Sequence, residues 1–322
     1  MMRLVTFRTP RNETRIGMHV DTDAPQIIDL TAADPVLFSD MLTLIRNEKK
    51  SMPLARKELT RFESGDRKGF TLHPEKDVEL LAPIPRPVSM RDGYAFRQHV
   101  ETARRNRGVP MIPEFDEFPI FYFTNHLAVT GPGELHVYGR QLERLDFELE
   151  VAIVTGKSGR NIKASEADRY IFGYMIMNDW SARALQMEEM KLNLGPAKGK
   201  DFATSIGPWL VPREDLEEFM TRTAQGEKHN LRMQAWVNGI QLSDGNLKDI
   251  SWTFAQILER ISYGTNIEAG EVVGSGTVGT GCFLELNGSK ITDNQWLKPG
   301  DEIVLEVDQL GRLAHKIVEI RE

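Results

Sequence analysis

The alternation of apolar and polar residues is clearest over residues 147–152, where Glu148 and Glu150 are interleaved with apolar positions. A period of two predicts a β-strand on which both glutamates face the same side. Their Cα atoms would lie about 6.5–7 Å apart, so both carboxylates could reach one cation. The spacing alone fits an exposed edge strand with solvated glutamates equally well.

A second strand and a helix follow this first strand. The apolar run at residues 174–177 predicts a buried strand that ends at Asp179, and residues 182–191 are predicted to be helical. Asp179 is therefore expected at a strand-to-helix junction, where binding residues are common. Arg183 and Gln186 are three residues apart and lie on one helical face. The alternative is a surface helix with a solvated arginine.

Residues 1–82 are predicted to form a small α+β unit with a structural or interface role. Residues 34–64 have helical spacing, and the proline-rich stretch 81–87 predicts an extended hinge. Short apolar runs between polar turns predict strands at residues 3–7, 15–20 and 26–30.

The remainder of the chain is predicted to be rich in antiparallel strands. Asn238-Gly239 and Asn287-Gly288 are both strong signals for type I′ hairpin turns, and residues 252–261 between them predict an amphipathic helix. Residues 274–279 fit the pattern G-x-G-x-x-G, which binds a dinucleotide only when a helix follows. Residues 282–286 predict a strand instead, so we reject the dinucleotide site.

The composition narrows the class of protein. The chain of 322 residues can form one large or two modest domains and needs no disulfide to stabilise its core. A formal net charge of −7 argues against nucleic acid or an anionic membrane as the main partner. A single cysteine, Cys282, excludes an internal disulfide, and we expect it to pack in the core.

The chain shows no obvious membrane or export signal. No apolar run approaches the ~20 residues that span a bilayer, and the first residues lack the apolar core of a signal peptide. We therefore predict a cytoplasmic protein without a membrane partner.

Several motifs together resemble the fumarylacetoacetate hydrolase family, over roughly residues 84–318. The family pattern is an E-x-E strand, a glycine-containing segment and then N-D-x-S-x-R-x-x-Q. The matching residues are Glu148, Glu150, Asn178, Asp179, Ser181, Arg183 and Gln186.

The segment after the hinge extends the resemblance. Members with fumarylacetoacetase activity have a metal-binding aspartate, a substrate-contacting tyrosine two residues later and a general-base histidine seven residues later. Asp92, Tyr94 and His99 have this spacing. A histidine with a pKa near ~6.5 suits proton abstraction at neutral pH. Taken alone, His99 would more often be a surface residue of a helix.

Three later positions also match the family. Lys200 lies in a Gly-Lys-x-Phe segment whose lysine belongs to the site, although Lys198 is only two residues away. Thr277 matches a threonine that contacts the substrate. Glu285 matches the glutamate that orients the catalytic histidine, because a carboxylate on one imidazole nitrogen raises the basicity of the other. Taken alone, Lys200 would usually be a solvated lysine, and Glu285 fits a polar residue on the open face of a strand equally well.

The resemblance is weakest directly after His99. One of the next arginines could bind a substrate carboxylate, although a solvated charge run is more common. Residues 119–129 replace a glycine motif of the family, and Tyr122, Asn125 and His126 could line the far end of the ligand. The arginines are Arg104, Arg105 and Arg107.

The resemblance implies an α+β, strand-rich fold, with a mixed β-roll of the fumarylacetoacetase C-terminal type over residues 83–322. It also implies a homodimer and one divalent cation held by carboxylates. All-oxygen ligation favours Mg²⁺, with Ca²⁺ or Mn²⁺ as alternatives, over zinc. The implied ligands are Asp92, Glu148, Glu150 and Asp179.

The implied activity is metal-dependent hydrolysis of a C–C bond in a 1,3-diketo acid such as an acylpyruvate. His99, oriented by Glu285, would activate water. Lys200, with Arg183 and Gln186, would stabilise the oxyanion. The residues implied to contact the substrate are Tyr94, Arg183, Gln186 and Thr277.

Two alternatives stay open. A decarboxylase, isomerase or hydratase acting on a 2-oxo dicarboxylic acid of aromatic catabolism would use the same metal without activating water. A non-enzymatic cation-binding protein would retain the carboxylates, but it would need neither His99 nor the cationic residues Arg183 and Lys200.

Overall fold

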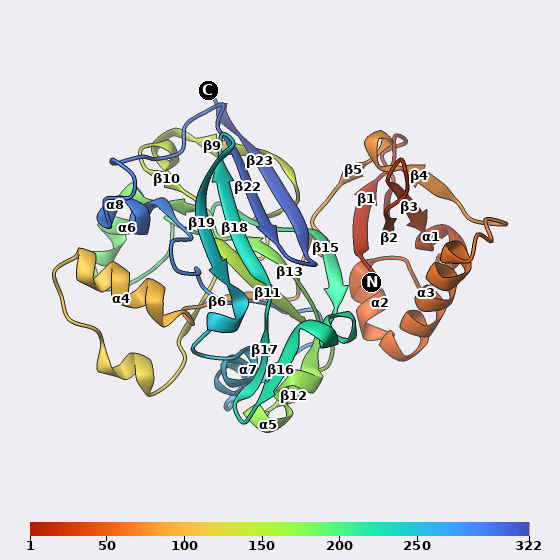
Figure 1. The fold of residues 1–322 in the computed structure, drawn as a ribbon, viewed down its shortest axis with the longest axis horizontal. Helices are drawn as coiled ribbons and strands as arrows, with labels where there is room; N and C mark the ends of the chain where they lie inside the picture. The colour runs from red at the N-terminus through yellow and green to blue at the C-terminus, as the bar shows by residue number, and fades with distance from the viewer. Residues whose placement is uncertain (322) are drawn as a thin grey trace.

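The computed structural model describes residues 1–321, so Glu322, the last residue of the predicted catalytic domain, lies outside the described residues. Its main feature is a mixed sheet of order β4-β3-β2-β1-β15-β13-β11-β21-β6-β7, with β5 beside β1 and β8 beside β15. The predicted strand-rich α+β class is confirmed (Figure 1). The strands of this sheet are β1 (Leu4–Arg8), β2 (Thr14–Val20), β3 (Gln26–Asp29), β4 (Leu72–Pro74), β5 (Glu79–Leu80), β6 (Met90–Gly93), β7 (Phe121–Phe123), β8 (Val129–Thr130), β11 (Leu149–Thr155), β13 (Ile171–Asn178), β15 (Thr204–Pro212) and β21 (Val272–Gly274).

A second sheet has the order β19-β18-β22-β23-β9 and packs against the first. Its strands are β9 (Gly133–Tyr138), β18 (Arg232–Val237), β19 (Ile240–Asn246), β22 (Glu302–Val307) and β23 (Gly311–Ile320). The predicted turn at Asn238-Gly239 joins β18 to β19, and both residues have the positive φ of a type I′ turn. Three small ribbons complete the strands: β10 (Leu145–Asp146) with β14 (Ser181–Ala182), β12 (Gly159–Arg160) with β20 (Asn266–Ile267), and β16 (Met220–Thr223) with β17 (Gly226–His229).

The helices are short and lie around the sheets. The predicted helix at 252–261 is observed as α7, whose N-terminus is closed by a capping box of Thr253 and Gln256. Of the described residues, no helix is both long and apolar enough to cross a bilayer. The α-helices are α1 (Leu30–Ala33), α2 (Met41–Arg46), α3 (Glu48–Glu63), α4 (Arg97–Asn106), α5 (Ala164–Ala167), α6 (Arg183–Met190), α7 (Phe254–Ser262) and α8 (Phe283–Gly288).

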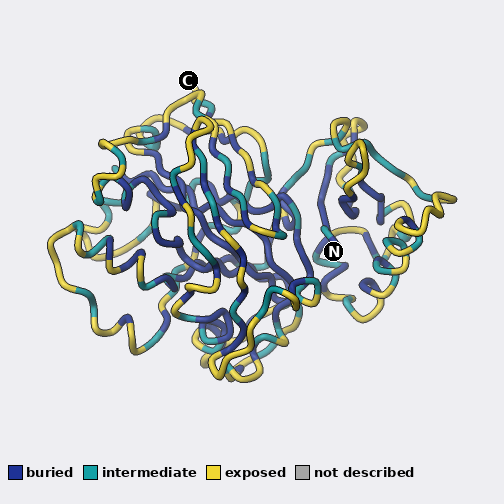
Figure 2. Tube along the Cα trace, in the orientation of Figure 1, coloured by how far each residue is buried: buried dark blue, intermediate teal, exposed yellow. Residues whose placement is uncertain are grey.

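The N-terminal residues form the strands and helices that the sequence predicts, and they extend the large sheet. β1 pairs with β15 through Leu4 and Leu210. Buried residues of this unit share one apolar cluster with Met177 and Ile206 of the central strands. Figure 1 shows the unit beside β15, and Figure 2 shows the buried chain continuing through the central strands. The domain boundary after residue 82 stays a prediction.

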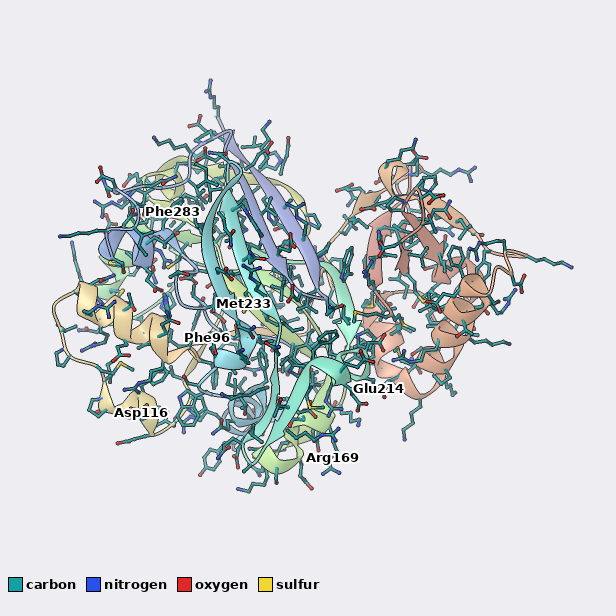
Figure 3. All side chains as sticks on the ribbon, in the orientation of Figure 1. Phe96, Asp116, Arg169, Glu214, Met233 and Phe283 are labelled. Carbon is teal, nitrogen blue, oxygen red and sulfur yellow. The ribbon has the colours of Figure 1, made fainter. Side chains whose placement is uncertain are left out.

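The strand at residues 282–286 and the hairpin turn at Asn287-Gly288 were wrong predictions. The chain forms α8 there instead, and this helix packs on α4. The cause lies far away in sequence, because Asp146 accepts hydrogen bonds from the backbone amides of Phe283 (to Oδ1, 2.7 Å) and Leu284 (to Oδ2, 3.0 Å). A carboxylate at this position satisfies amides that have no partner within the helix and favours its N-terminus. Figure 3 labels Phe283, where α8 begins, and Phe96, which directly precedes α4.

His315 on β23 gives the fold a predicted sensitivity to acid. Its Nε2 donates to the carbonyl of Gly131 at 3.0 Å, while Nδ1 is buried without a partner among residues 1–321. Burial lowers the pKa of His315 to about 4. The unfolded chain, with a histidine pKa near ~6.5, binds the proton more readily, so stability falls as the pH falls from about 6.5 towards 4.

We expect His315 to remove about 2 kcal/mol of unfolding free energy between pH 6.5 and pH 5. Urea unfolding at both pH values measures this loss. In His315→Gln, which keeps a donor for Gly131 but does not titrate, the loss should be smaller by that amount. An equal loss in both proteins would contradict the assignment.

Candidate active site

Four buried carboxylates meet on and beside strands β6, β11 and β13 of the large sheet. Asp92 lies on β6, Glu150 on β11, Glu148 directly before β11, and Asp179 directly after β13. One oxygen from each of the four lies within 4.8 Å of the others. The structure thus brings together all four predicted metal ligands from three chain segments, because β13, β11, β21 and β6 are neighbours in the sheet.

The glycine-rich loop after β21 donates backbone hydrogen bonds to this cluster. The amide of Gly276 donates to Asp92 Oδ1 at 3.0 Å and to Glu150 Oε2 at 3.1 Å. Gly276 has a φ of +77°, and a Cβ on Gly274 would lie 2.3 Å from Asp92 Oδ1. Gly274 is therefore required for close approach to Asp92, and Gly276 for its left-handed backbone. A helix does follow the loop, contrary to our prediction, but its first amides are bound to Asp146.

Two cations and a phenol contact the carboxylates directly. Lys200 Nζ donates to Asp179 Oδ2 at 2.7 Å and also to Glu148. Arg183 Nη2 donates to Glu148 Oε1 at 2.7 Å. The hydroxyl of Tyr122 donates to Asp179 Oδ2, whereas Asp179 Oδ1 is buried with no hydrogen-bond partner among the described residues.

The electrostatics of the cluster fit a bound divalent cation. Burial and the neighbouring Asp179 raise the pKa of Asp92 to about 7, and burial with Asp92 raises the pKa of Glu150 well above its usual value. Only Glu148 has a lowered pKa, about 2, because Lys200 and Arg183 outweigh the effect of burial. Negative charge is therefore in excess, and the donors are all oxygens, as hard cations prefer.

A buried histidine–glutamate pair lies on the two packed helices α4 and α8. His99 Nδ1 and Glu285 Oε2 are 2.6 Å apart, and the backbone amide of Thr280 donates to Glu285 Oε1 at 2.9 Å. The ring of Tyr94 meets the His99 ring edge to face, with centroids 5.7 Å apart. The carboxylate accepts from Nδ1–H, which leaves Nε2 as the basic nitrogen. His99 is near enough to Glu148 for its charge to lower the pKa of that carboxyl group.

Replacing Glu285 with glutamine is expected to lower kcat by about 10–100-fold, because the amide cannot orient and polarise the imidazole as the carboxylate does. An unchanged kcat would contradict the role of Glu285.

The other predicted site residues lie beside these two groups. Arg183 Nη1 donates to Gln186 Oε1 at 2.9 Å, and the hydroxyl of Thr277 is 3.5 Å from Glu150 Oε1. Lys200 and not Lys198 belongs to the cluster, because Lys198 pairs with Asp201 on the surface at 2.8 Å. The structure therefore groups all the predicted residues, while their catalytic roles stay predictions.

The arginines after His99 are not gathered at the cluster. Arg104 and Arg107 donate to backbone carbonyls of their own segment, and Arg105 donates to Thr102. Arg107 is nevertheless close enough to Tyr94 for its charge to oppose the rise in the tyrosine pKa that burial causes. Arg107 thus acts on a predicted substrate contact through its charge.

Asp146 was not predicted as a site residue from the sequence, and the contact of Tyr122 with Asp179 was not predicted either. Asp146 is fully buried and accepts from Arg183 Nε at 2.8 Å, so it connects the arginine to the start of α8. Its signal was present, because Asp146 precedes Glu148 by two residues and continues the same alternation. Tyr122 was considered for the far end of the ligand. It lies on the edge strand β7, and its hydroxyl donates a hydrogen bond to Asp179.

Comparison with known proteins gives the same family as the sequence motifs. The family described as "Fumarylacetoacetate (FAA) hydrolase C-terminal" matches residues 89–318. Oxaloacetate tautomerase YisK of Bacillus subtilis (strain 168) is 28% identical over 320 residues, covering 95% of this chain and 97% of that protein. Mitochondrial oxaloacetate tautomerase FAHD2A of Homo sapiens is 28% identical over 322 residues, covering 98% and 92%.

A solved structure supports the fold. The fumarylacetoacetate hydrolase EaFAH of psychrophilic Exiguobacterium antarcticum superposes with a TM-score of 0.72 at 23% identity, over 99% of this chain and all of that one. The motifs, the fold and the extent of the family match agree. The chain belongs to the fumarylacetoacetate hydrolase family.

Proposed function

We propose that the protein is a divalent-cation-dependent enzyme that interconverts the keto and enol forms of a 2-oxo dicarboxylic acid such as oxaloacetate. The observation that carries this proposal is the buried His99–Glu285 pair beside an all-oxygen carboxylate cluster. Two relatives that match almost the whole chain are named oxaloacetate tautomerases, which supports this chemistry over the C–C hydrolysis that the sequence resemblance implied.

His99 is the proton carrier in this proposal. Its Nε2 accepts a proton from the carbon beside the substrate carbonyl, and the enolate oxygen that results takes up a proton to give the enol. In the reverse direction the enol oxygen loses its proton and Nε2 returns one to the carbon. Glu285 holds the imidazole in the tautomer that leaves Nε2 free. The pair is buried, so bulk water is kept away from the proton in transit.

The cationic residues hold the site in its charged state. Lys200 uses two of its three donors on Glu148 and Asp179, which leaves one N–H for a developing enolate oxygen. Arg183 is fixed by Asp146, Glu148 and Gln186 and keeps Glu148 ionised. Asp92, Glu148, Glu150 and Asp179 would hold the cation, which, when bound, supplies positive charge that favours the enolate.

The same pair could activate water, so C–C hydrolysis is the second candidate. Both reactions need a base at His99, and they differ in what leaves the site. Hydrolysis of an acylpyruvate gives two acids, decarboxylation releases CO₂, and tautomerisation gives no new molecule. Analysis of products therefore decides among them.

The deciding experiment follows the ultraviolet decay of freshly dissolved oxaloacetate enol with enzyme and Mg²⁺. Mg²⁺ alone is the blank, because free cations also promote enolisation. Faster decay without CO₂ supports the proposal. Cleavage of an acylpyruvate without faster enol decay would replace it with the hydrolase, and cation binding without any turnover would leave a non-enzymatic protein. The ion, a homodimer and the cellular compartment stay predictions.

A further inference from the structure

Three side chains at the catalytic pair form a second group of metal donors. One ring nitrogen of His99, the sulfur of Cys282 and a carboxylate oxygen of Glu285 lie within 4.8 Å of one another. All three residues are buried, and none of them belongs to the four-carboxylate cluster. The proposed reaction uses His99 and Glu285 but gives Cys282 no part.

The donor types differ sharply between the two groups. Asp92, Glu148, Glu150 and Asp179 offer oxygen only, whereas this trio offers nitrogen, sulfur and oxygen. Imidazole, thiolate and carboxylate are the donors that zinc binds in proteins, and thiolate is a poor ligand for Mg²⁺. Each group therefore selects a different kind of ion.

The geometry of the trio is close to that of a zinc site. Donor atoms that share one tetrahedral zinc are roughly 3.3–3.6 Å apart, from bond lengths near 2.0–2.3 Å. The donors here need to move by on the order of 1 Å, a shift within the reach of side-chain rotation. His99 and Glu285, now 2.6 Å apart, would separate slightly. With three protein ligands, a tetrahedral ion keeps a fourth position for water.

The charges also balance. A divalent ion on a thiolate, a carboxylate and a neutral imidazole gives no net charge, which suits a buried position. On binding, the thiol proton is released to solvent, and the proton on Nδ1 of His99 moves to Nε2, so that Nδ1 can bind the ion and the imidazole stays neutral.

We infer that His99, Cys282 and Glu285 form an inhibitory site for borderline-soft divalent ions such as Zn²⁺, distinct from the carboxylate site for the activating cation. With the ion on Nδ1, Nε2 of His99 carries the remaining ring proton and has no lone pair to accept one from the substrate, so turnover stops. The inhibition rests on the proposed function, whereas the binding does not.

The first test titrates Zn²⁺ against enol–keto turnover at saturating Mg²⁺, in wild type and in Cys282→Ser. Serine keeps the size of the side chain but is a much weaker zinc ligand, and Cys282 has no role in the proposed reaction, so uninhibited activity should be unchanged. We expect the Zn²⁺ concentration for half inhibition to rise at least tenfold in the variant. Equal inhibition of both proteins, or inhibition relieved in proportion to added Mg²⁺, would place zinc at the carboxylates and overturn the inference.

The second test needs no activity. Co²⁺ replaces zinc and gives a strong near-ultraviolet charge-transfer band when a thiolate binds it. Because Cys282 is the only cysteine in the chain, such a band in the Mg²⁺-loaded protein reports this site alone. We expect the band in wild type and its absence in Cys282→Ser. No band in wild type would overturn the inference, while a band in an inactive protein would instead count against the proposed function.

Discussion

Replacing His99 with alanine is expected to lower kcat for keto–enol interconversion by about 10²–10⁴-fold, the usual contribution of a positioned general base. Alanine removes the nitrogen that carries the proton, and Glu285 on α8 would then have no imidazole to orient. The four carboxylates are untouched, so KM should change far less than kcat. Initial rates of enol decay, corrected for the reaction with Mg²⁺ alone, measure the effect.

His136→Ala is the matched control. His136 lies on β9 with its side chain 56% exposed and paired with Glu134, so its removal should leave turnover unchanged. Comparable urea midpoints would show that both variants are folded. If His99→Ala kept more than a tenth of wild-type kcat, proton transfer through His99 would be excluded.

The residues that sequence could predict are those whose position follows from local periodicity. Glu148, directly before β11, and Glu150 on β11 alternate with apolar residues, and the apolar run before Asp179 ends where β13 ends. Each strand is recognisable alone, and the pairing of β11 with β13 then brings the three carboxylates together.

The parts that sequence could not predict depend on distant contacts. α8 is a six-residue helix whose sequence contains Asn287-Gly288, a hairpin signal in isolation. Its first amides are satisfied by Asp146, more than a hundred residues earlier, and this tertiary contact overrides the local preference. The same error hid the geometry of Glu285, which faces His99 from a helix and not from the open side of a strand.

The sequence predicts the residues of the site better than it predicts the reaction. Both a carbon acid and a water molecule can lose a proton to the same histidine, so the His99–Glu285 pair does not distinguish tautomerisation from hydrolysis. Selection between them depends on which molecule the space beside the pair admits. The segments proposed for the far end of the ligand follow His99, where the family resemblance is weakest.

Removal of the cation is expected to lower turnover by about 10²–10³-fold, because several kcal/mol of charge stabilisation at the developing enolate is lost. The same removal should destabilise the fold. A cation at about 100 times its dissociation constant adds about 2.7 kcal/mol to the free energy of unfolding. Chelator titration of both the rate and the urea midpoint measures the two effects on one sample.

Glu150→Gln separates a cation at this cluster from one elsewhere. The amide can still accept from Gly276, but it carries no charge, so repulsion with Asp92 falls. The cation-free variant should therefore be more stable than cation-free wild type, while added Mg²⁺ should stabilise it little and activate it poorly. Asp244→Asn, which removes an exposed carboxylate paired with Arg232, should respond to Mg²⁺ as wild type does.

The two possible roles of Glu150 predict changes in cation-free stability of opposite sign. A carboxylate that only stabilises the fold would, when replaced, lower stability with and without Mg²⁺. A carboxylate held in excess for a cation costs stability in its absence, because burial and its neighbours already oppose its charge. Equal stabilisation of Glu150→Gln and wild type by Mg²⁺ would place the cation outside this cluster. A gain in cation-free stability together with a loss of turnover would tie both effects to the same four carboxylates.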